Sequence, residues 1–119
     1  MSETAAARAV IEEYIEACRV RSVERLKAIF HPDALMSGYL MEQRLIGSTQ
    51  PFYDALLHAP ADPSGSRYQG EITSVDVIGR IASVTLQEQG FLGLNFTDYF
   101  HLLKIDGQWK IVAKTFTTK

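Results

Sequence analysis

An Asp-Gly pair near the C-terminus, Asp106-Gly107, separates two runs that are rich in β-branched, aromatic and other apolar residues. Asp-Gly between such runs is the strongest short-range signal for a β-hairpin with a two-residue turn. If these two residues form the whole turn, Ile105 faces Gln108 and Leu102 faces Ile111. The pair therefore predicts a C-terminal hairpin and also the register of its two strands.

Side chains alternate along a strand, so the predicted hairpin has two faces. One face should hold Phe96, Asp98, Phe100, Leu102, Trp109, Ile111, Ala113 and Thr115. The other should hold Tyr99, His101, Leu103, Ile105, Lys110, Val112 and Lys114. Both faces are substantially apolar, so we expect both to be covered, and we assign the face with Trp109 and Ile111 to the core.

Asp98 is the single carboxylate on the predicted core face, between Phe96 and Phe100. A lone acid among apolar neighbours either has a partner or belongs to a functional site. Apolar surroundings raise the pKa of a carboxyl group toward neutrality, which suits proton transfer. Asp98 is therefore a candidate acid, base or ligand anchor. The alternative is a structural carboxylate bonded to backbone, tyrosine or lysine.

The first half of the chain has helical patterns with short strands between them. Apolar residues recur at helical spacing over residues 3–19, and Ser22 is a plausible N-cap for a second, short helix. That helix should stop at His31-Pro32, because the residue before proline disfavours the helical conformation. Residues 34–40 and 44–46 follow as short strands.

A third helix is predicted from Gly47 to before Pro60, with Pro51 in its first turn, and residues 59–67 are predicted to form a loop. From Tyr68 onward the apolar period changes to two, and Gly79-Arg80 should join two further strands, residues 71–78 and 81–88.

Helices early and strands late predict an α+β fold with helices packed on one face of a sheet. At 119 residues the chain should form a single domain, residues 1–119, large enough to bury a core.

The charge distribution argues against binding to nucleic acid. The net charge is −2, and lysine and arginine are scattered along the chain and form no basic patch. Membrane insertion is not expected either, because no apolar stretch approaches the roughly 20 residues of a membrane span. Glu12, Glu13 and Glu16 interrupt any apolar run of a signal peptide, so we expect a cytoplasmic protein.

No metal or cofactor is expected. The single cysteine, Cys18, excludes an intrachain disulfide and a multi-cysteine zinc site, and its place on a helical apolar stripe predicts a buried, inert thiol. His31, His58 and His101 fall on different elements without a close ligand pair. Neither a glycine-rich phosphate loop nor a Gly-x-Ser-x-Gly motif occurs.

Two motifs, Phe30-His-Pro-Asp-Ala34 and Asp106-Gly-Gln-Trp-Lys-Ile111, together with the order of elements, resemble the nuclear transport factor 2-like superfamily. Phe96-Thr-Asp-Tyr-Phe100 with Leu102-Leu-Lys104 is similar to its group named putative lumazine-binding, close to the SnoaL-like polyketide cyclases. The resemblance implies a cone, in which three helices pack on a strongly curved, mixed but mostly antiparallel sheet with a pocket in its mouth. Members include isomerases, dehydratases, cyclases and binding domains, so the fold does not choose among them.

The resemblance adds His31 and Asp33 to Asp98 as candidate catalytic residues, because the matching stretch of superfamily enzymes often lies near the pocket. The alternative is structural. A histidine at a helix C-terminus complements the helix dipole, and aspartate after proline favours a turn.

Aromatic residues are the candidates for lining the pocket, although aromatics at such spacing also form plain core. The candidates are Tyr14, Tyr39, Phe52, Tyr53, Phe96, Phe100 and Trp109. Glu88 falls on the same predicted strand face as Val84 and Leu86 and can approach the same cavity as Asp98. Paired carboxylates split their pKa values, which would suit acid/base chemistry.

The second apolar face of the hairpin must also meet a partner, and a second copy of the chain is the simplest one. We therefore expect a homodimer through Tyr99, His101, Leu103 and Val112.

Three functions stay open at this point. The first is binding of a small apolar or aromatic ligand. The second is a cofactor-independent isomerase, dehydratase or cyclase that uses Asp98 with His31 or Tyr14. The third is a non-catalytic dimerisation module. The enzyme requires two titratable groups that converge on one point of a cavity.

Overall fold

The computed structural model describes residues 2–59 and 68–119. Its elements, in chain order, are α1 (Glu3–Arg19), α2 (Val23–Ile29), β1 (Phe30–Leu40), β2 (Gln43–Ser48), α3 (Gln50–His58), β3 (Gln69–Ile78), β4 (Ile81–Phe91), β5 (Leu94–Ile105) and β6 (Gln108–Thr118). The predicted loop at 59–67 lies outside the described residues apart from its first position.

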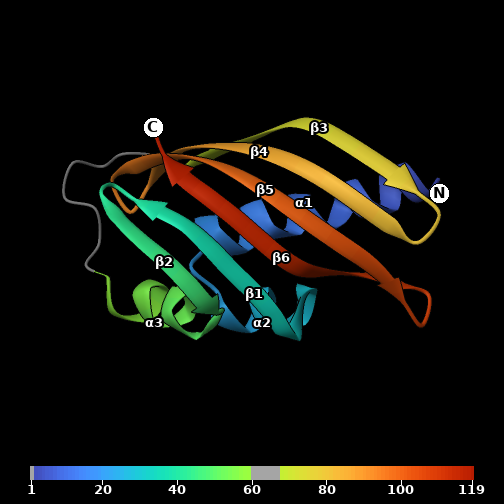
Figure 1. Cartoon of the computed structure of the whole chain (residues 1–119), viewed down its shortest axis with the longest axis horizontal. Helices are drawn as coiled ribbons and strands as arrows, with labels where there is room; N and C mark the ends of the chain where they lie inside the picture. Colours follow the sequence, from blue (N-terminus) through green and yellow to red (C-terminus); the bar gives the residue numbers. More distant parts are fainter. Residues whose placement is uncertain (1, 60–67) are drawn as a thin grey trace.

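The six strands form one sheet in the order β2-β1-β6-β5-β4-β3. Only β1 and β6 run parallel, and the other neighbours are antiparallel. Figure 1 shows the long strands β3 to β6 curving around α1, with α2 and α3 near β1 and β2. The predicted α+β architecture, three helices on a curved and mostly antiparallel sheet, is confirmed.

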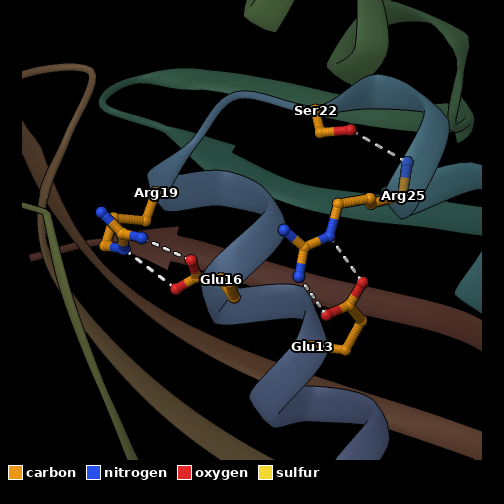
Figure 2. A network of polar contacts seen from close by, with 5 residues as sticks. All are labelled: Glu13, Glu16, Arg19, Ser22 and Arg25. Atoms are coloured by element: carbon orange, nitrogen blue, oxygen red, sulfur yellow. Dashed lines mark hydrogen bonds and ion pairs between the residues drawn. The ribbon is translucent and has the colours of Figure 1, made fainter.

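Polar contacts fix the turn between α1 and α2 (Figure 2). The Ser22 side chain accepts a hydrogen bond from the Arg25 backbone N–H at 3.2 Å, which is the N-cap that the sequence predicts. The Arg25 guanidinium binds the Glu13 carboxylate through two contacts of 2.8 and 2.6 Å. A second pair, Arg19 with Glu16, lies within α1. The Arg25 contacts therefore tie α2 to the outer side of α1.

The Asp106-Gly107 turn is formed as predicted. Both residues have positive φ, 50° and 81°, as a type I′ turn requires, and Ile105 pairs with Gln108. Gly79-Arg80 also forms the predicted two-residue turn, with Ile78 opposite Ile81.

The predicted faces of β6 are wrong beyond Ile111. Leu102 pairs with Ile111 as expected, but His101 pairs with Ala113, so β6 contains one extra residue at this point. A β-bulge of this kind exchanges the two faces of the strand that follows it. Lys114 is consequently buried and Thr115 exposed, the reverse of the prediction.

The start of β1 also differs from the prediction. The helix ends at Ile29, before the His31-Pro32 step. The strand begins at Phe30, four residues before the predicted start at residue 34. The pairing of β1 with β6 shifts between Phe30 and Leu35, and Pro32 lies in this irregular part, where a missing N–H is tolerated.

The core lies between α1 and the inner face of the sheet. Ala7, Ile11 and Tyr14 of α1 are fully buried there, as are Phe100 and Ile111 of the sheet. Cys18 belongs to the same core, and burial raises the pKa of its thiol, so it is the buried, unreactive cysteine that the sequence predicts.

Candidate functional site

A cavity of about 420 Å³ lies inside the curve of the sheet, at the end where β1, β2 and α3 meet β4, β5 and β6. Its walls are almost wholly apolar, and the two charged side chains among the described lining residues are Glu88 and Lys114. The lining residues are Met36, Leu40, Leu45, Ile46, Gly47, Ser48, Pro51, Phe52, Ala55, Glu88, Phe91, Leu92, Leu94, Phe96, Lys114 and Phe116. Apolar pockets with a few fixed polar groups are typical small-molecule sites.

Lys114 is 4% exposed, and its ammonium is fixed by aromatic side chains. Nζ donates a hydrogen bond to the Tyr14 hydroxyl at 2.7 Å and lies 4.3 Å from the centre of the Phe52 ring. The rings of Tyr14, Phe91 and Phe116 also lie within 6 Å of Nζ. Aromatic faces attract a cation, so this lysine holds its position without an ion pair among the described residues. An ammonium has three donors, which leaves donors for a ligand.

Glu88 is 1% exposed, and its carboxyl group faces the same cavity. Oε2 accepts a hydrogen bond from the Tyr68 hydroxyl at 2.5 Å. Burial raises the pKa of Glu88 well above its ordinary value of 4.5, and the neighbouring Asp98 adds to that rise. The Lys114 charge and the Tyr68 hydrogen bond act in the opposite direction.

Asp98, on the strand paired with that of Glu88, is fully buried. On the paired strands Asp98 faces Leu86 and Glu88 faces Phe96, so the two carboxyl groups are diagonal neighbours on one sheet face. The charge of Asp98 and a hydrogen bond with its side chain both contribute to the raised pKa of Glu88. Asp98 does not line the cavity, so it acts on a ligand only through Glu88.

Tyr14 and Tyr68 complete the polar group. Burial is the main cause that raises the pKa of both phenols. The nearby Cys18 adds to the rise for Tyr14 and the nearby Glu88 adds to it for Tyr68, so both remain neutral hydroxyls at ordinary pH. Tyr14 supports the ammonium and Tyr68 supports the carboxyl group that face the cavity. Five titratable groups from α1, the start of the β3 hairpin, β4, β5 and β6 therefore converge at the inner end of one apolar cavity, and this arrangement is suited to moving protons.

The structure separates the aromatic candidates. Phe52 and Phe96 line the cavity. Phe100 lies in the core, edge-on to the Tyr14 ring at 4.8 Å between centres. Trp109 is buried in the core and does not line the cavity.

Tyr53 lies at the helical end of the core, outside the cavity wall. Its ring packs edge-on against Phe30, with 6.2 Å between centres, and lies under the Lys27 ammonium at 5.5 Å.

Three further candidates lie outside the cavity wall. His31 Nδ1 accepts a hydrogen bond from the Asp33 backbone N–H at 3.0 Å, a local contact at the start of β1, and Asp33 is exposed. Tyr39 is 50% exposed on the outer face of the sheet, because alternation along β1 turns Met36 and Leu40 inward in its place.

Sequence reasoning missed Lys114, Phe116 and Tyr68. A signal for the first two was present: Ile111, Val112 and Ala113 are three consecutive apolar residues, which interrupts the alternation of an ordinary strand and is consistent with a bulge. Tyr68 stands just before β3, where no local pattern indicates its direction.

Among residues 2–59 and 68–119, no cluster of three histidine, cysteine or acidic side chains has the geometry of a metal site. In the same two segments no helix has both the length and the apolar character needed to cross a membrane.

Comparison with known families gives one match over almost the whole chain. Residues 2–117 match the family described as putative lumazine-binding. Aldolase FrzH from Cladobotryum sp. is 31% identical over 104 residues, which cover 87% of this chain and 81% of that protein.

Solved structures agree with this match. A nuclear transport factor 2-like protein of unknown function from Shewanella baltica OS155 superposes with a TM-score of 0.87 at 25% identity, over 98% of this chain and 94% of that one. A similar protein of unknown function from Silicibacter pomeroyi DSS-3 has a TM-score of 0.85 at 29% identity, over 97% and 94% of the two chains.

Proposed function

We propose that this protein, which belongs to the family described as putative lumazine-binding, is an enzyme that moves a proton next to the carbonyl group of a small, mainly apolar compound. One observation supports this most directly. A buried carboxyl group, Glu88, and a buried ammonium, Lys114, both face a cavity whose other described walls are almost entirely apolar. A base and an oxyanion-stabilising cation in one dry site are the two groups that such chemistry needs.

The roles follow from the charges. Glu88, in its ionised form, accepts the proton from the carbon next to the carbonyl, and the electrons of the broken C–H bond form the C=C bond of an enolate. Lys114 donates a hydrogen bond to the carbonyl oxygen, which becomes the enolate oxygen. A raised pKa brings Glu88 closer to the operating pH, where a carboxylate is a stronger base.

The enolate can then react in two ways. Return of the proton to a different carbon gives an isomerisation. Alternatively, the enolate carbon forms a bond to the carbon of a second carbonyl group, whose oxygen takes the proton from Glu88, and this is an aldol addition. The similarity to a protein named as an aldolase favours the second course.

Binding without catalysis is the second candidate function, and the apolar character of the cavity wall favours it. In that case Glu88 and Lys114 orient the ligand through hydrogen bonds but leave its C–H bonds intact.

Hydrogen exchange separates the two candidates. A panel of small apolar ketones and aldehydes, including cyclohexanone and hexanal, would be incubated with the protein in D₂O, and loss of the proton next to the carbonyl would be followed by NMR. We expect enzyme-dependent exchange that falls by about 10²-fold to 10⁴-fold in Glu88→Gln, the range for loss of a general base.

Lys114→Met should reduce the exchange by about 10²-fold to 10³-fold, the range for loss of one oxyanion donor. Lys104→Met is the matched control, because Lys104 forms a surface ion pair with Glu3. Ligand binding with no exchange in the wild type would exclude the enzyme and leave the binding protein. Equal exchange in the wild type and Glu88→Gln would exclude Glu88 as the base.

We also infer that the chain forms a homodimer through the outer face of the sheet. Tyr99 is 58% exposed and Leu103 39% exposed, and His101 and Val112 lie beside them on that face. A second copy of the same face would cover these side chains.

A further inference from the structure

Three buried carboxyl oxygens at the inner end of the cavity have no hydrogen-bond donor among the described residues. They are Oε1 of Glu88 and both side-chain oxygens of Asp98. Two ionised carboxylates side by side in apolar surroundings would repel each other and leave these acceptors empty. A proton on either carboxyl group turns one acceptor into a donor, which the other group can accept. We call Glu88 and Asp98 the carboxyl pair.

The groups that face the carboxyl pair come from each element packed around it. Tyr14 and Cys18 belong to α1, Tyr68 precedes β3, and Lys114 belongs to β6. Tyr14, Cys18 and Tyr68 are neutral at ordinary pH, because burial raises the pKa of each. Lys114 is then the positive charge that faces the pair, and a pair with one proton has one negative charge to balance it.

We propose that the carboxyl pair shares one proton in the resting protein, so that together with the Lys114 ammonium the site has no net charge and selects an uncharged carbonyl compound over a carboxylate of the same shape. The ligand class rests on the proposed function, whereas the shared proton rests on the burial, the diagonal strand positions and the unpartnered oxygens of the two carboxyl groups.

The shared proton also gives Asp98 a defined task. When the proton is on Asp98, Glu88 is the carboxylate that accepts a proton from the substrate, and the pair then holds two protons. One of them returns to the product, which restores the resting state. Asp98 is therefore a positioning residue that sets the protonation of Glu88 without touching the ligand.

Infrared spectroscopy tests the shared proton without any ligand. A protonated carboxyl group has a C=O stretching band that is separate from the carboxylate bands and shifts in D₂O. We expect one such band at pH 7 in the wild type. It should vanish in both Glu88→Gln and Asp98→Asn, because the new amide donates the hydrogen bond that the proton supplied.

The exposed acids Glu71 and Asp76 on β3 provide controls, and Glu71→Gln and Asp76→Asn should retain the band. Circular dichroism would establish that each variant is folded. A wild type without the band at pH 7, or a band that survives in either variant of the pair, would overturn the shared proton.

A pair of probes tests the ligand class. Cyclohexyl methyl ketone and cyclohexanecarboxylate have the same ring and nearly the same shape, and NMR titration would give their affinities. We expect the ketone to bind the wild type at least tenfold more tightly. In the double variant Glu88→Gln/Asp98→Asn the Lys114 ammonium has no balancing charge. The affinity for cyclohexanecarboxylate should therefore rise at least tenfold.

Carboxylate binding as tight as ketone binding in the wild type, or no ketone binding, would overturn the selection. Absence of proton exchange with the infrared band and the ketone preference intact would count against the proposed enzyme alone, so the two failures are distinguishable.

Discussion

The ammonium nitrogen of Lys114 lies 2.7 Å from the hydroxyl oxygen of Tyr14, a residue that precedes it by 100 positions. This hydrogen bond joins the first helix to the last strand at the inner end of the cavity. Both side chains are buried, so water cannot replace the hydroxyl as the hydrogen-bond acceptor. The bond therefore sets the direction of the ammonium.

Tyr14→Phe should therefore impair both folding stability and function. Loss of one partner of a buried hydrogen bond to a charged group costs about 1–3 kcal/mol in the free energy of unfolding. We expect that loss in urea denaturation, together with a lower rate of proton exchange, because the ammonium is no longer directed. Tyr39→Phe, half-exposed on the outer face, is the control and should change stability by less than about 0.5 kcal/mol. Equal stability of the two variants would contradict the prediction.

Stability should depend on pH through Glu88. Its folded pKa is raised, so between 4.5 and the raised value the folded protein binds a proton that the unfolded chain does not. The stabilisation is full below pH 4.5 and is lost as the pH rises through the folded pKa, with a slope of up to about 1.4 kcal/mol per pH unit. Urea denaturation from pH 5 to 9 measures it.

Glu88→Gln should remove this part of the slope, whereas Glu71→Gln, on an exposed position of β3, should run parallel to the wild type. If the difference between the wild type and Glu88→Gln did not vary with pH, Glu88 would be ionised throughout the range.

Tyr68→Phe should move the pH dependence of activity upward. The Tyr68 hydroxyl donates to the Glu88 carboxylate, and this hydrogen bond lowers the pKa of Glu88. Its removal should raise that pKa further. The midpoint of the increase in exchange rate with pH should therefore lie at a higher pH than in the wild type. Tyr39→Phe, half-exposed on the other side of the sheet, should leave the profile unchanged. An identical profile for Tyr68→Phe would mean that the hydroxyl does not act on Glu88 in solution.

Gly38→Ala should separate β1 from β6. A Cβ atom at this position would lie 2.0 Å from the backbone oxygen of Phe116, so one strand must move. Overpacking of this kind costs about 1–3 kcal/mol, and ligand affinity should fall as well, because Phe116 lines the cavity. Gly47→Ala, where a Cβ atom meets nothing within 4 Å, is the control for thermal unfolding. Similar melting temperatures for both variants would show that β1 can move away from β6 without a loss of stability.

Leu103→Glu should disrupt the proposed homodimer. A carboxylate in the centre of an apolar contact would face the same residue or its neighbours across the interface, and burying it is unfavourable. Analytical ultracentrifugation should show dimers for the wild type and monomers for this variant. Leu57→Glu, which is exposed on α3, should remain dimeric. A monomeric wild type would end the proposal.

Local chemistry explains why much of the fold could be predicted. The turn at Asp106-Gly107 depends on two residues that accept positive φ, and the cap at Ser22 depends on one hydroxyl, so both can be recognised from a few neighbouring letters. Alternation along β4 correctly brought Glu88 to the same sheet face as Asp98.

The rest of the site depends on long-range packing. The one-residue bulge between Ile111 and Ala113 lies in the pairing of β6 with β5, at a distance from the Asp106-Gly107 turn. The cavity wall contributed by β2 and α3 depends on how distant segments meet. His31 and Asp33 were candidates only through a motif, and the motif does not fix the direction in which their side chains point.

The extra residue in β6 has a consequence for the comparison of related chains. Trp109 and Lys114 are an odd number of positions apart, yet both are buried on the inner side. A relative that keeps both letters but loses one residue between them would direct its amino group into solvent. The number of residues between the tryptophan and the lysine, more than the presence of the lysine itself, should therefore distinguish relatives with a buried ammonium in the cavity from relatives that share only the fold.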